Sequence, residues 1–352
     1  MRLASFIAGR AGTAGRAGIA SGVAAVIALS GCRPRDQAQP APLSPAPAPL
    51  PAPQPGPQRS DSSCAAPFDG ASARAQLRPA GGTLRIGALA GLKDADDDNL
   101  LHLRALTAEL KRRGAEVLIA DGDLGDNSDE QETLLGVLAE TGLPLVVAAG
   151  NREVRSELDA AEDELRKKGA HLADLSHTRV VDLGDALVVG LPGAFERRQL
   201  RADGACLYVQ KDLDALASFL DHLPAGAPPA LLVAAIPPRG QDARALDASE
   251  GQNLGDARLA ALLRRAPFGI FGQVWEAGGR AVDLAGQPVP AATEVERLYV
   301  NPGAADLTPW PMTDGSTAQG LAALLTIHGR KASFEIVRAP PRAAEKAGEH
   351  SR

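Results

Sequence analysis

Polar residues that could do chemistry occur in this sequence directly after apolar runs. The run Val117–Ala120 leads to Asp123, and the run Leu143–Ala149 leads to Asn151 and Arg152. Carboxylate and amide oxygens are ligands for hard divalent cations. A guanidinium keeps its proton near neutral pH, so it can bind an anion but cannot act as a general acid. These strand ends therefore carry a carboxylate and an amide of ligand type, and a guanidinium that could bind an anion.

Three further segments follow apolar runs in the same way but contain no carboxylate and no imidazole. They read Gly87-Ala88-Leu89-Ala90-Gly91, Ala234-Ala235-Ile236-Pro237-Pro238 and Gly272-Gln273-Val274-Trp275. In order, spacing and flanks, the five segments resemble the active-site loops of the calcineurin-like metallophosphoesterase family. Those loops read D-x-H, GD-x-x-D/E, GN-H-D/E, a single His and GH-x-H.

Matched residue by residue to the family, this chain keeps the family's residue at only two of eight key positions. Asp123 takes the position of a carboxylate that bridges two metal ions, and Asn151 takes that of an amide ligand. Two dications that share an attacking water need several carboxylate, imidazole and amide ligands. We therefore expect no metal, no other cofactor and no catalytic residue. The six replaced positions, which the family fills with one Asp and five His, are Ala88, Ala90, Arg152, Ala235, Gln273 and Trp275.

The remaining polar residues of the site allow two interpretations. Asp123 could be a turn residue that accepts backbone N–H groups. If it lies buried without metals, it needs a new partner, because an unpaired buried carboxylate is costly. We then expect the Arg152 guanidinium beside Asp123, and Trp275 over the space left by the metals.

The resemblance also implies a fold and a class of function. The fold would be two packed mixed β-sheets flanked by helices, a four-layer α/β/β/α sandwich. The domain would be catalytically degenerate and would bind or scaffold a partner. The alternative is an active metal-dependent phosphoesterase with a reduced or relocated site, which would hold a divalent metal pair.

The chain between the five segments alternates between strand and helix patterns, which favours a mostly parallel sheet covered by helices. Asp98 is placed to cap the first helix. Turns at Gly184 and Gly329 predict two hairpins. The expected helices are Asp98–Arg113, Glu130–Glu140, Glu153–Lys168, Asp212–Leu223 and Leu254–Arg265.

Residues 1–31 have the pattern of a secretory signal peptide. Arginines precede the apolar stretch Ile19–Leu29, which is too short to span a bilayer. The tetrapeptide Leu29-Ser30-Gly31-Cys32 resembles a bacterial lipobox, which implies that Cys32 is lipidated. Arg33 at the next position implies sorting to the outer membrane. An ordinary signal peptide with a chance cysteine is the alternative.

The rest of the chain divides by composition. We expect residues 32–82 to be a Pro/Ala-rich flexible tether, residues 83–338 to form the metallophosphoesterase-like domain, and residues 339–352 to be a disordered tail. In an oxidising compartment Cys64 and Cys206 could form a disulfide, or they could stay as two free thiols.

The charge of the chain bears on its partners. The formal net charge is −6, which gives no basic footprint for nucleic acid. The expected partners are the membrane, through Cys32, and an unidentified envelope protein. The protein would be anchored in the bacterial envelope and face the periplasm.

Overall fold

The computed structural model describes residues 64–68, 74–76 and 81–340. Cys32, the expected signal peptide and most of the expected tether and tail lie outside the described residues. Within the described part, no helix is both long and apolar enough to cross a membrane.

The first sheet consists of six strands, which are β2 (Thr83–Leu89), β3 (Val117–Asp121), β4 (Leu145–Ala148), β5 (Leu172–Asp174), β16 (Leu321–His328) and β17 (Lys331–Arg338). Their order in space is β17-β16-β2-β3-β4-β5. Strands β2 to β5 run parallel, and the C-terminal hairpin β16–β17 adds two antiparallel strands beside β2. The carboxyl ends of β2, β3 and β4 therefore share one edge of this sheet.

The second sheet has seven strands, which are β1 (Arg74–Gln76), β6 (Val180–Asp182), β7 (Leu187–Gly190), β8 (Ala230–Val233), β11 (Phe268–Ile270), β12 (Arg280–Val282) and β13 (Leu298–Asn301). Their order is β1-β6-β7-β8-β11-β13-β12. Strands β7, β8, β11 and β13 are parallel. The predicted hairpin around Gly184 is present as the antiparallel pair β6–β7.

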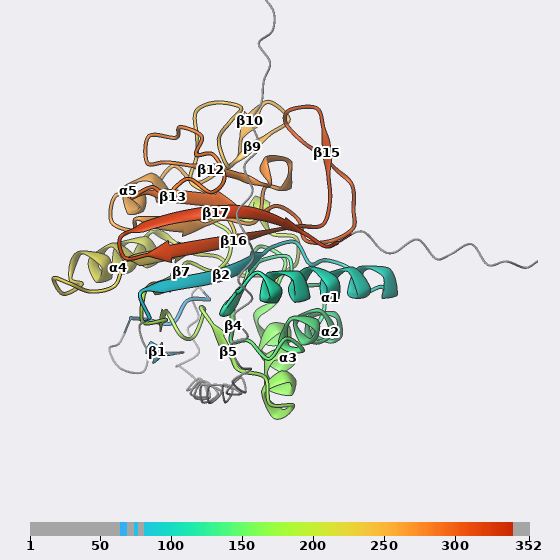
Figure 1. The fold of residues 1–352 in the computed structure, drawn as a ribbon. Coiled ribbons are helices and arrows are strands. Elements are labelled where there is room, and N and C mark those ends of the chain that lie inside the picture. Colours follow the sequence, from blue (N-terminus) through green and yellow to red (C-terminus); the bar gives the residue numbers. More distant parts are fainter. Residues whose placement is uncertain (1–63, 69–73, 77–80, 341–352) are drawn as a thin grey trace, which may run out of the picture. The chain divides into compact units, whose positions relative to one another are not determined.

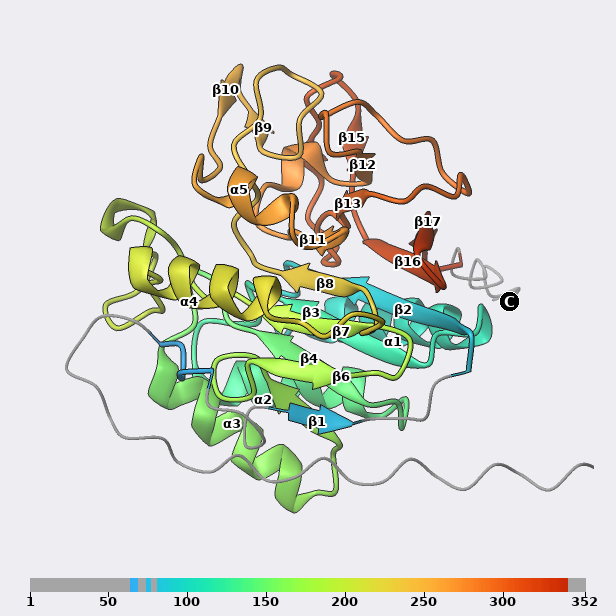
Figure 2. The same ribbon diagram turned by 90° about the vertical axis from the view of Figure 1, so that its left-hand side faces the viewer.

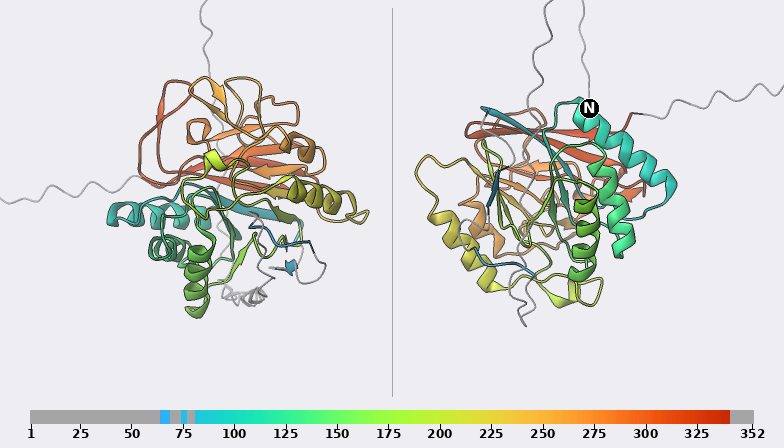
Figure 3. Two further views of the ribbon diagram at one scale, coloured as in Figure 1. Left: turned by 180° about the vertical axis from the view of Figure 1, so that it is seen from behind. Right: turned by 90° about the horizontal axis from the view of Figure 1, so that it is seen from below.

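Helices cover the outer face of each sheet. Helices α1 (Asp97–Arg112), α2 (Ser128–Ala139) and α3 (Arg155–Lys167) lie on the first sheet, and α4 (Gln210–Asp221) and α5 (Leu259–Leu263) lie on the second (Figures 1 and 2). Views from behind and from below show the two groups of helices on opposite sides of the paired sheets (Figure 3). The expected four-layer α/β/β/α sandwich is confirmed.

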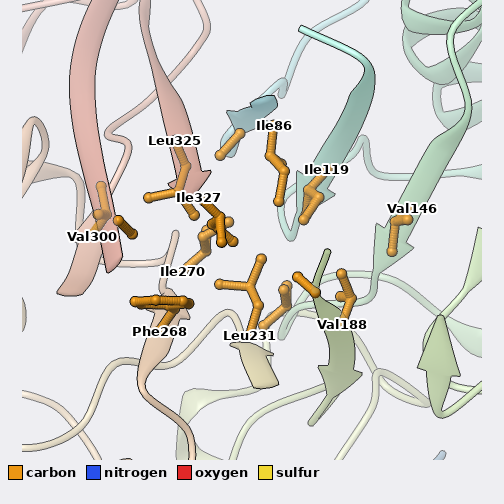
Figure 4. Packing of buried hydrophobic residues seen from close by; sticks show 14 of the residues in the cluster. Ile86, Ile119, Val146, Val188, Leu231, Phe268, Ile270, Val300, Leu325 and Ile327 are labelled. Atoms are coloured by element: carbon orange, nitrogen blue, oxygen red, sulfur yellow. The ribbon is translucent and has the colours of Figure 1, made fainter. Parts of the chain in front are cut away.

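Successive side chains of a strand point to opposite faces of its sheet, and this alternation produces the layers. Ile86 and Ile119 of the first sheet pack against Leu231 and Phe268 of the second in the core between the sheets (Figure 4). Leu118, which alternates with Ile119, instead packs on the helical side of its sheet. Burying each of these side chains contributes about 1.5–3 kcal/mol, so the central core fixes the position of the strand ends.

Two expected helix boundaries were wrong. Asp96, not Asp98, caps α1, because its side chain accepts a hydrogen bond from the Asn99 N–H at 3.0 Å. Helix α5 lacks the first turn expected from Leu254 onward. A Cβ on Gly255 would lie 2.4 Å from the Pro237 carbonyl oxygen, so this segment is packed against the loop after β8. It does not form a helical turn there.

The fold includes part of the segment assigned to the tether. Cys64 forms a disulfide with Cys206, and β1 pairs with β6 in parallel. Arg179 is 1% exposed and donates hydrogen bonds to the carbonyl oxygens of Ala66 and Gly190. These contacts hold residues 64–68 and 74–76 against the folded domain. The Pro-rich composition upstream gives no sign of them in the sequence.

Short elements complete the loops at the carboxyl ends of the strands. They carry many of the side chains that line the cleft described below. These elements are β9 (Ala248–Ser249), β10 (Gln252–Asn253), β14 (Trp310–Pro311), β15 (Thr317–Ala318), and the 3-10 turns η2 (Arg197–Gln199) and η3 (Trp275–Ala277).

Candidate functional site

The five loops singled out in the sequence follow β2, β3, β4, β8 and β11, and the structure brings them to one edge of the paired sheets. The Gly91 N–H donates to the Gly122 oxygen at 3.1 Å, which joins the first loop to the second. The Gln273 N–H donates to the Ala235 oxygen at 2.9 Å, which joins the fifth loop to the fourth. This convergence creates a common site from segments far apart in sequence.

The Glu153 side chain links the second loop to the third by hydrogen bonds. Its buried carboxylate accepts hydrogen bonds from the Leu124 N–H at 2.7 Å and the Gly150 N–H at 2.6 Å. The two backbones are close: a Cβ on Gly150 would lie 3.0 Å from the Gly122 Cα, which leaves little room for a side chain. Burial, helped by the nearby Asp123 charge, raises the pKa of Glu153 to about 7.

Asp123 lies buried in the second loop with a left-handed backbone, at φ 54°. The Arg152 Nε is 3.9 Å from the Asp123 Oδ1 but 3.2 Å from the Asp126 Oδ1. The expected close pairing of Arg152 with Asp123 is therefore replaced by a loose ion pair. Arg152 is partly exposed and Asp126 lies at the rim, where the guanidinium keeps contact with water.

The environment of Asp123 favours its neutral form. Burial raises the pKa of Asp123 to about 6, against the opposing charges of Arg152 and Lys93. The cations beside Asp123 thus offset only part of the cost of burying its charge. Its carboxyl group is poised to change protonation state near neutral pH.

Two amide side chains extend the site beyond Asp123. The Asn151 Nδ2 donates to the Gln199 carbonyl oxygen at 2.6 Å. Within the described part of the chain, the Asn151 Oδ1 and the Gln273 Oε1 are buried and have no hydrogen-bond partner. Both oxygens are therefore acceptors with unused capacity.

The alanine positions are filled by buried methyl groups. Ala88, Ala90 and Ala235 are each 0% exposed, and Ala88 packs in the core between the sheets. A Cβ on Gly272 would lie 2.3 Å from the Ala90 Cβ, so the methyl group already fills that space. With methyl groups at three of the positions that the resemblance assigns to metal ligands and an indole at a fourth, these residues do not fit a pair of dications.

A lysine that the sequence motifs did not single out lies at the centre of the site. The Lys93 Nζ is 3.5 Å from the ring centroids of both Trp275 and Trp310, and 3.7 Å from the Asp306 Oδ2. Burial lowers the pKa of Lys93, while the charges of Asp306 and Asp123 oppose this shift. Trp275 thus packs over the site as expected, but it does so around a cation supplied by the chain.

The site opens into a cleft of about 1200 Å³. Arg198 pairs with Glu196, and Arg258 pairs with Asp256. Five guanidinium groups line the cleft. Two of them, on exposed side chains, form no ion pair within the described residues, which leaves them available to an anion. The five arginines are Arg152, Arg198, Arg201, Arg239 and Arg258, and the two without an ion pair are Arg201 and Arg239.

A second cluster of possible metal ligands lies away from this cleft, on α3, at the end of β5 and just after it. It consists of Asp159, Asp174 and His177. The Arg155 guanidinium donates to Asp159 at 2.5 Å and to Asp174 at 2.6 Å. Because a cation of the chain already binds both carboxylates, we interpret the cluster as a closed ion-pair network.

Comparisons with known proteins support the fold. No family model matches the sequence, and no curated protein matches it. One solved structure superposes with a TM-score of 0.54 at 15% identity, covering 72% of this chain and 98% of that chain. This likeness shows the two-sheet sandwich alone.

Two other similar structures are phosphatases. A dimetal phosphatase from Danio rerio has a TM-score of 0.46 at 12% identity, covering 73% of this chain and 99% of that chain. A purple acid phosphatase from yellow lupin has a TM-score of 0.45 at 13% identity, covering 75% of this chain and 53% of that chain.

Proposed function

We propose that this protein is a binding module on a metallophosphoesterase-like fold and does not hydrolyse phosphoesters with a metal pair. The observation that carries the proposal is the set of buried methyl groups at Ala88, Ala90 and Ala235, where the family places metal ligands. A methyl group offers no lone pair, and a Trp275 indole donates only one N–H. The remaining Asp123 and Asn151 cannot hold two dications.

The cleft favours a partner that carries an anionic group. Arg201 and Arg239 have no carboxylate partner among the described residues, and Arg152 is partly exposed. A guanidinium presents planar paired donors that match carboxylate and phosphate oxygens. The cleft would bind such a group without cleaving it.

One observation favours a second candidate, a phosphoesterase with a reduced metal site. The unpartnered Asn151 Oδ1 and Gln273 Oε1 are oxygen donors at the same edge as Asp123. Three oxygen ligands could hold one hard cation. The positive charges of Lys93 and Arg152 nearby oppose that occupancy.

Metal analysis combined with hydrolysis assays separates the two functions. The mature chain would be purified, incubated with Mg²⁺, Mn²⁺ or Zn²⁺, desalted, and assayed on phosphomonoesters and phosphodiesters. We expect substoichiometric metal and no hydrolysis above the buffer rate. One tightly bound metal per chain together with turnover would overturn the binding-module proposal.

We further propose that lipidated Cys32 anchors the domain in the envelope. The Cys64–Cys206 disulfide supports an oxidising compartment, because disulfides are rare in reducing cytosol. Replacement of Cys32 by Ser should leave an unprocessed precursor or release the protein from membranes. Membrane retention equal to that of the wild type would contradict the anchor.

A further inference from the structure

We propose that Lys93 is a built-in cation that replaces the metal ions of this fold, held in a cage formed by Trp275, Trp310 and Asp306. We further infer that the cage will accept an external alkylammonium ion once the lysine amine is removed. The inference rests on the proposed metal-free site, but its main readout depends on neither metal content nor hydrolysis.

The geometry of the cage is that of a cation-binding site. Ring centroids of the two indoles lie 4.4 Å apart with planes inclined at 47°, and the Lys93 Nζ lies 3.5 Å from each. A cation within about 6 Å of an aromatic centroid is attracted by the ring quadrupole, and most strongly by Trp. Asp306 completes the cage: its Oδ1 accepts from the Trp310 Nε1 at 3.4 Å, and its Oδ2 faces the ammonium at 3.7 Å.

The backbone around Lys93 supports this placement. Lys93 has a left-handed backbone, with φ 55°, which is unfavourable for a lysine. Its N–H donates to the Asp123 oxygen at 3.1 Å, and the Asp306 N–H donates to the Gly91 oxygen at 3.1 Å. The first loop is thus bonded both to the second loop and to the loop after β13. These bonds turn the lysine side chain into the site, where its interactions compensate for the strained backbone.

The Lys93 ammonium can balance the negative charge of the buried carboxylates in the site. Asp123 and Asp306 are 3% and 2% exposed, and a buried carboxylate is stable only when a cation or several donors accompany it. In the family, divalent metal ions would supply the positive charge beside these carboxylates. Here Trp275 occupies a ligand position of the family, and Lys93, held against its ring, lies 3.7 Å from the Asp306 carboxylate and also interacts through its charge with Asp123. The charge of the site therefore does not depend on the supply of metal.

The composition of the chain makes the cage directly observable. Trp275 and Trp310 are the only two tryptophans in the sequence. Intrinsic tryptophan fluorescence therefore reports on the cage alone. Replacement of Lys93 by Met keeps most of the length of the side chain and removes its charge, so it isolates the effect of the ammonium.

The experiment records tryptophan emission of the wild type, Lys93→Met and Lys93→Ala. The matched control is Lys331→Met, which changes an exposed lysine at the start of β17. We expect wild-type emission to show a pH-dependent step below the usual lysine range, since burial lowers the pKa of Lys93. This step should be lost in Lys93→Met and kept in Lys331→Met. Addition of EDTA or divalent metals should leave wild-type emission unchanged.

Chemical rescue tests the cage as a site. Methylammonium or ethylammonium added to Lys93→Ala should restore the wild-type emission and raise the melting temperature of the variant. Sodium chloride at the same ionic strength should do neither. Failure of both ammonium ions on a folded Lys93→Ala would overturn the external-cation part of the proposal.

Three further outcomes are decisive. If Lys93→Met and Lys331→Met keep the same emission and pH profile as the wild type, Lys93 does not occupy the cage. If Lys93→Ala does not fold, the pH titration of the wild type against Lys93→Met still decides that question. Stoichiometric metal binding with an intact lysine step in emission would instead contradict the metal-free function and leave the cage standing.

Discussion

Two charged clusters in this molecule, one on α3 and one in the cleft, differ in how closely their charges are paired. In the α3 cluster, Arg155 contacts Asp159 and Asp174 at 2.5 and 2.6 Å. In the cleft, the Arg152 Nε lies 3.9 Å from Asp123. Both clusters contain a buried carboxylate, Asp174 in one and Asp123 in the other, but the nearest guanidinium is closer in the α3 cluster.

The acids also differ in pKa, and Asp159 is 39% exposed whereas Asp123 is buried. Burial alone would raise the pKa of Asp159, but the hydrogen bond from His177 and the charge of Arg155 lower it. Burial raises the pKa of Asp123 to about 6, and the more distant cations do not reverse the shift. Close pairing does not cancel burial everywhere in the α3 network, because burial also raises the pKa of Glu162 beside Arg166. The two clusters are therefore distinguished by the distance between cation and carboxylate.

The largest effect that tests this comparison should come from Arg155→Met. The Asp174 side chain is fully buried, and loss of the guanidinium leaves its charge with only backbone donors such as the Ser176 N–H. Breaking a buried pair in this way costs about 3–5 kcal/mol. Urea unfolding at pH 7 would measure the loss in the free energy of unfolding.

The effect of pH should be of intermediate size and is tested by Asp123→Asn. The folded-state pKa of Asp123, about 6, lies above its ordinary value of 3.8. The folded state therefore binds the proton more tightly, and its stability falls as pH rises from about 4 to about 6. Since one pKa unit corresponds to about 1.4 kcal/mol, the decline should amount to about 1–3 kcal/mol.

Asp123→Asn should remove that part of the decline and exceed the wild type in stability at pH 8. Asparagine tolerates the left-handed backbone at this position, so the substitution adds no strain. Urea unfolding at pH 4.5 and pH 8 measures both effects. A variant less stable than the wild type at pH 8 would mean that Lys93 and Arg152 stabilise the ionised carboxylate more than burial opposes it.

The smallest effect should come from Arg152→Met, the matched counterpart of Arg155→Met. Arg152 is 29% exposed and its nearer partner, Asp126, is 60% exposed. Partly exposed ion pairs contribute about 0–1 kcal/mol. The same urea titration at pH 7 compares the two arginine variants. Equal losses from both would remove the distinction between the two clusters.

Much of the fold was predictable because it rests on local patterns. The alternation of Ile86 with Gly87, or of Leu118 with Ile119, is enough to assign residues to the two faces of a strand. Strand ends next to Gly122, Gly150 and Gly272 then place the loops at one edge. The long helices follow in the same way from their apolar stripes.

The centre of the site was not predictable, because it depends on long-range contacts. Lys93, Trp275, Trp310 and Asp306 come from three separate loops, and no short motif joins them. A signal was present in the composition: one of only two tryptophans lies at a position that the resemblance assigns to a metal ligand, and a half-buried indole needs neighbours. The closer approach of Arg152 to Asp126 likewise depends on side-chain direction, which spacing does not specify.

The disulfide between Cys64 and Cys206 connects positions 142 residues apart in sequence. Cys206 belongs to the loop that contains Gln199 and Arg201, whose backbones bond to the side chain and carbonyl of Asn151. A mechanical pull on the chain ahead of Cys64 would pass through this covalent link into the wall of the cleft. If Cys32 anchors the protein as proposed, tension on the anchor and occupancy of the cleft would act on the same loop.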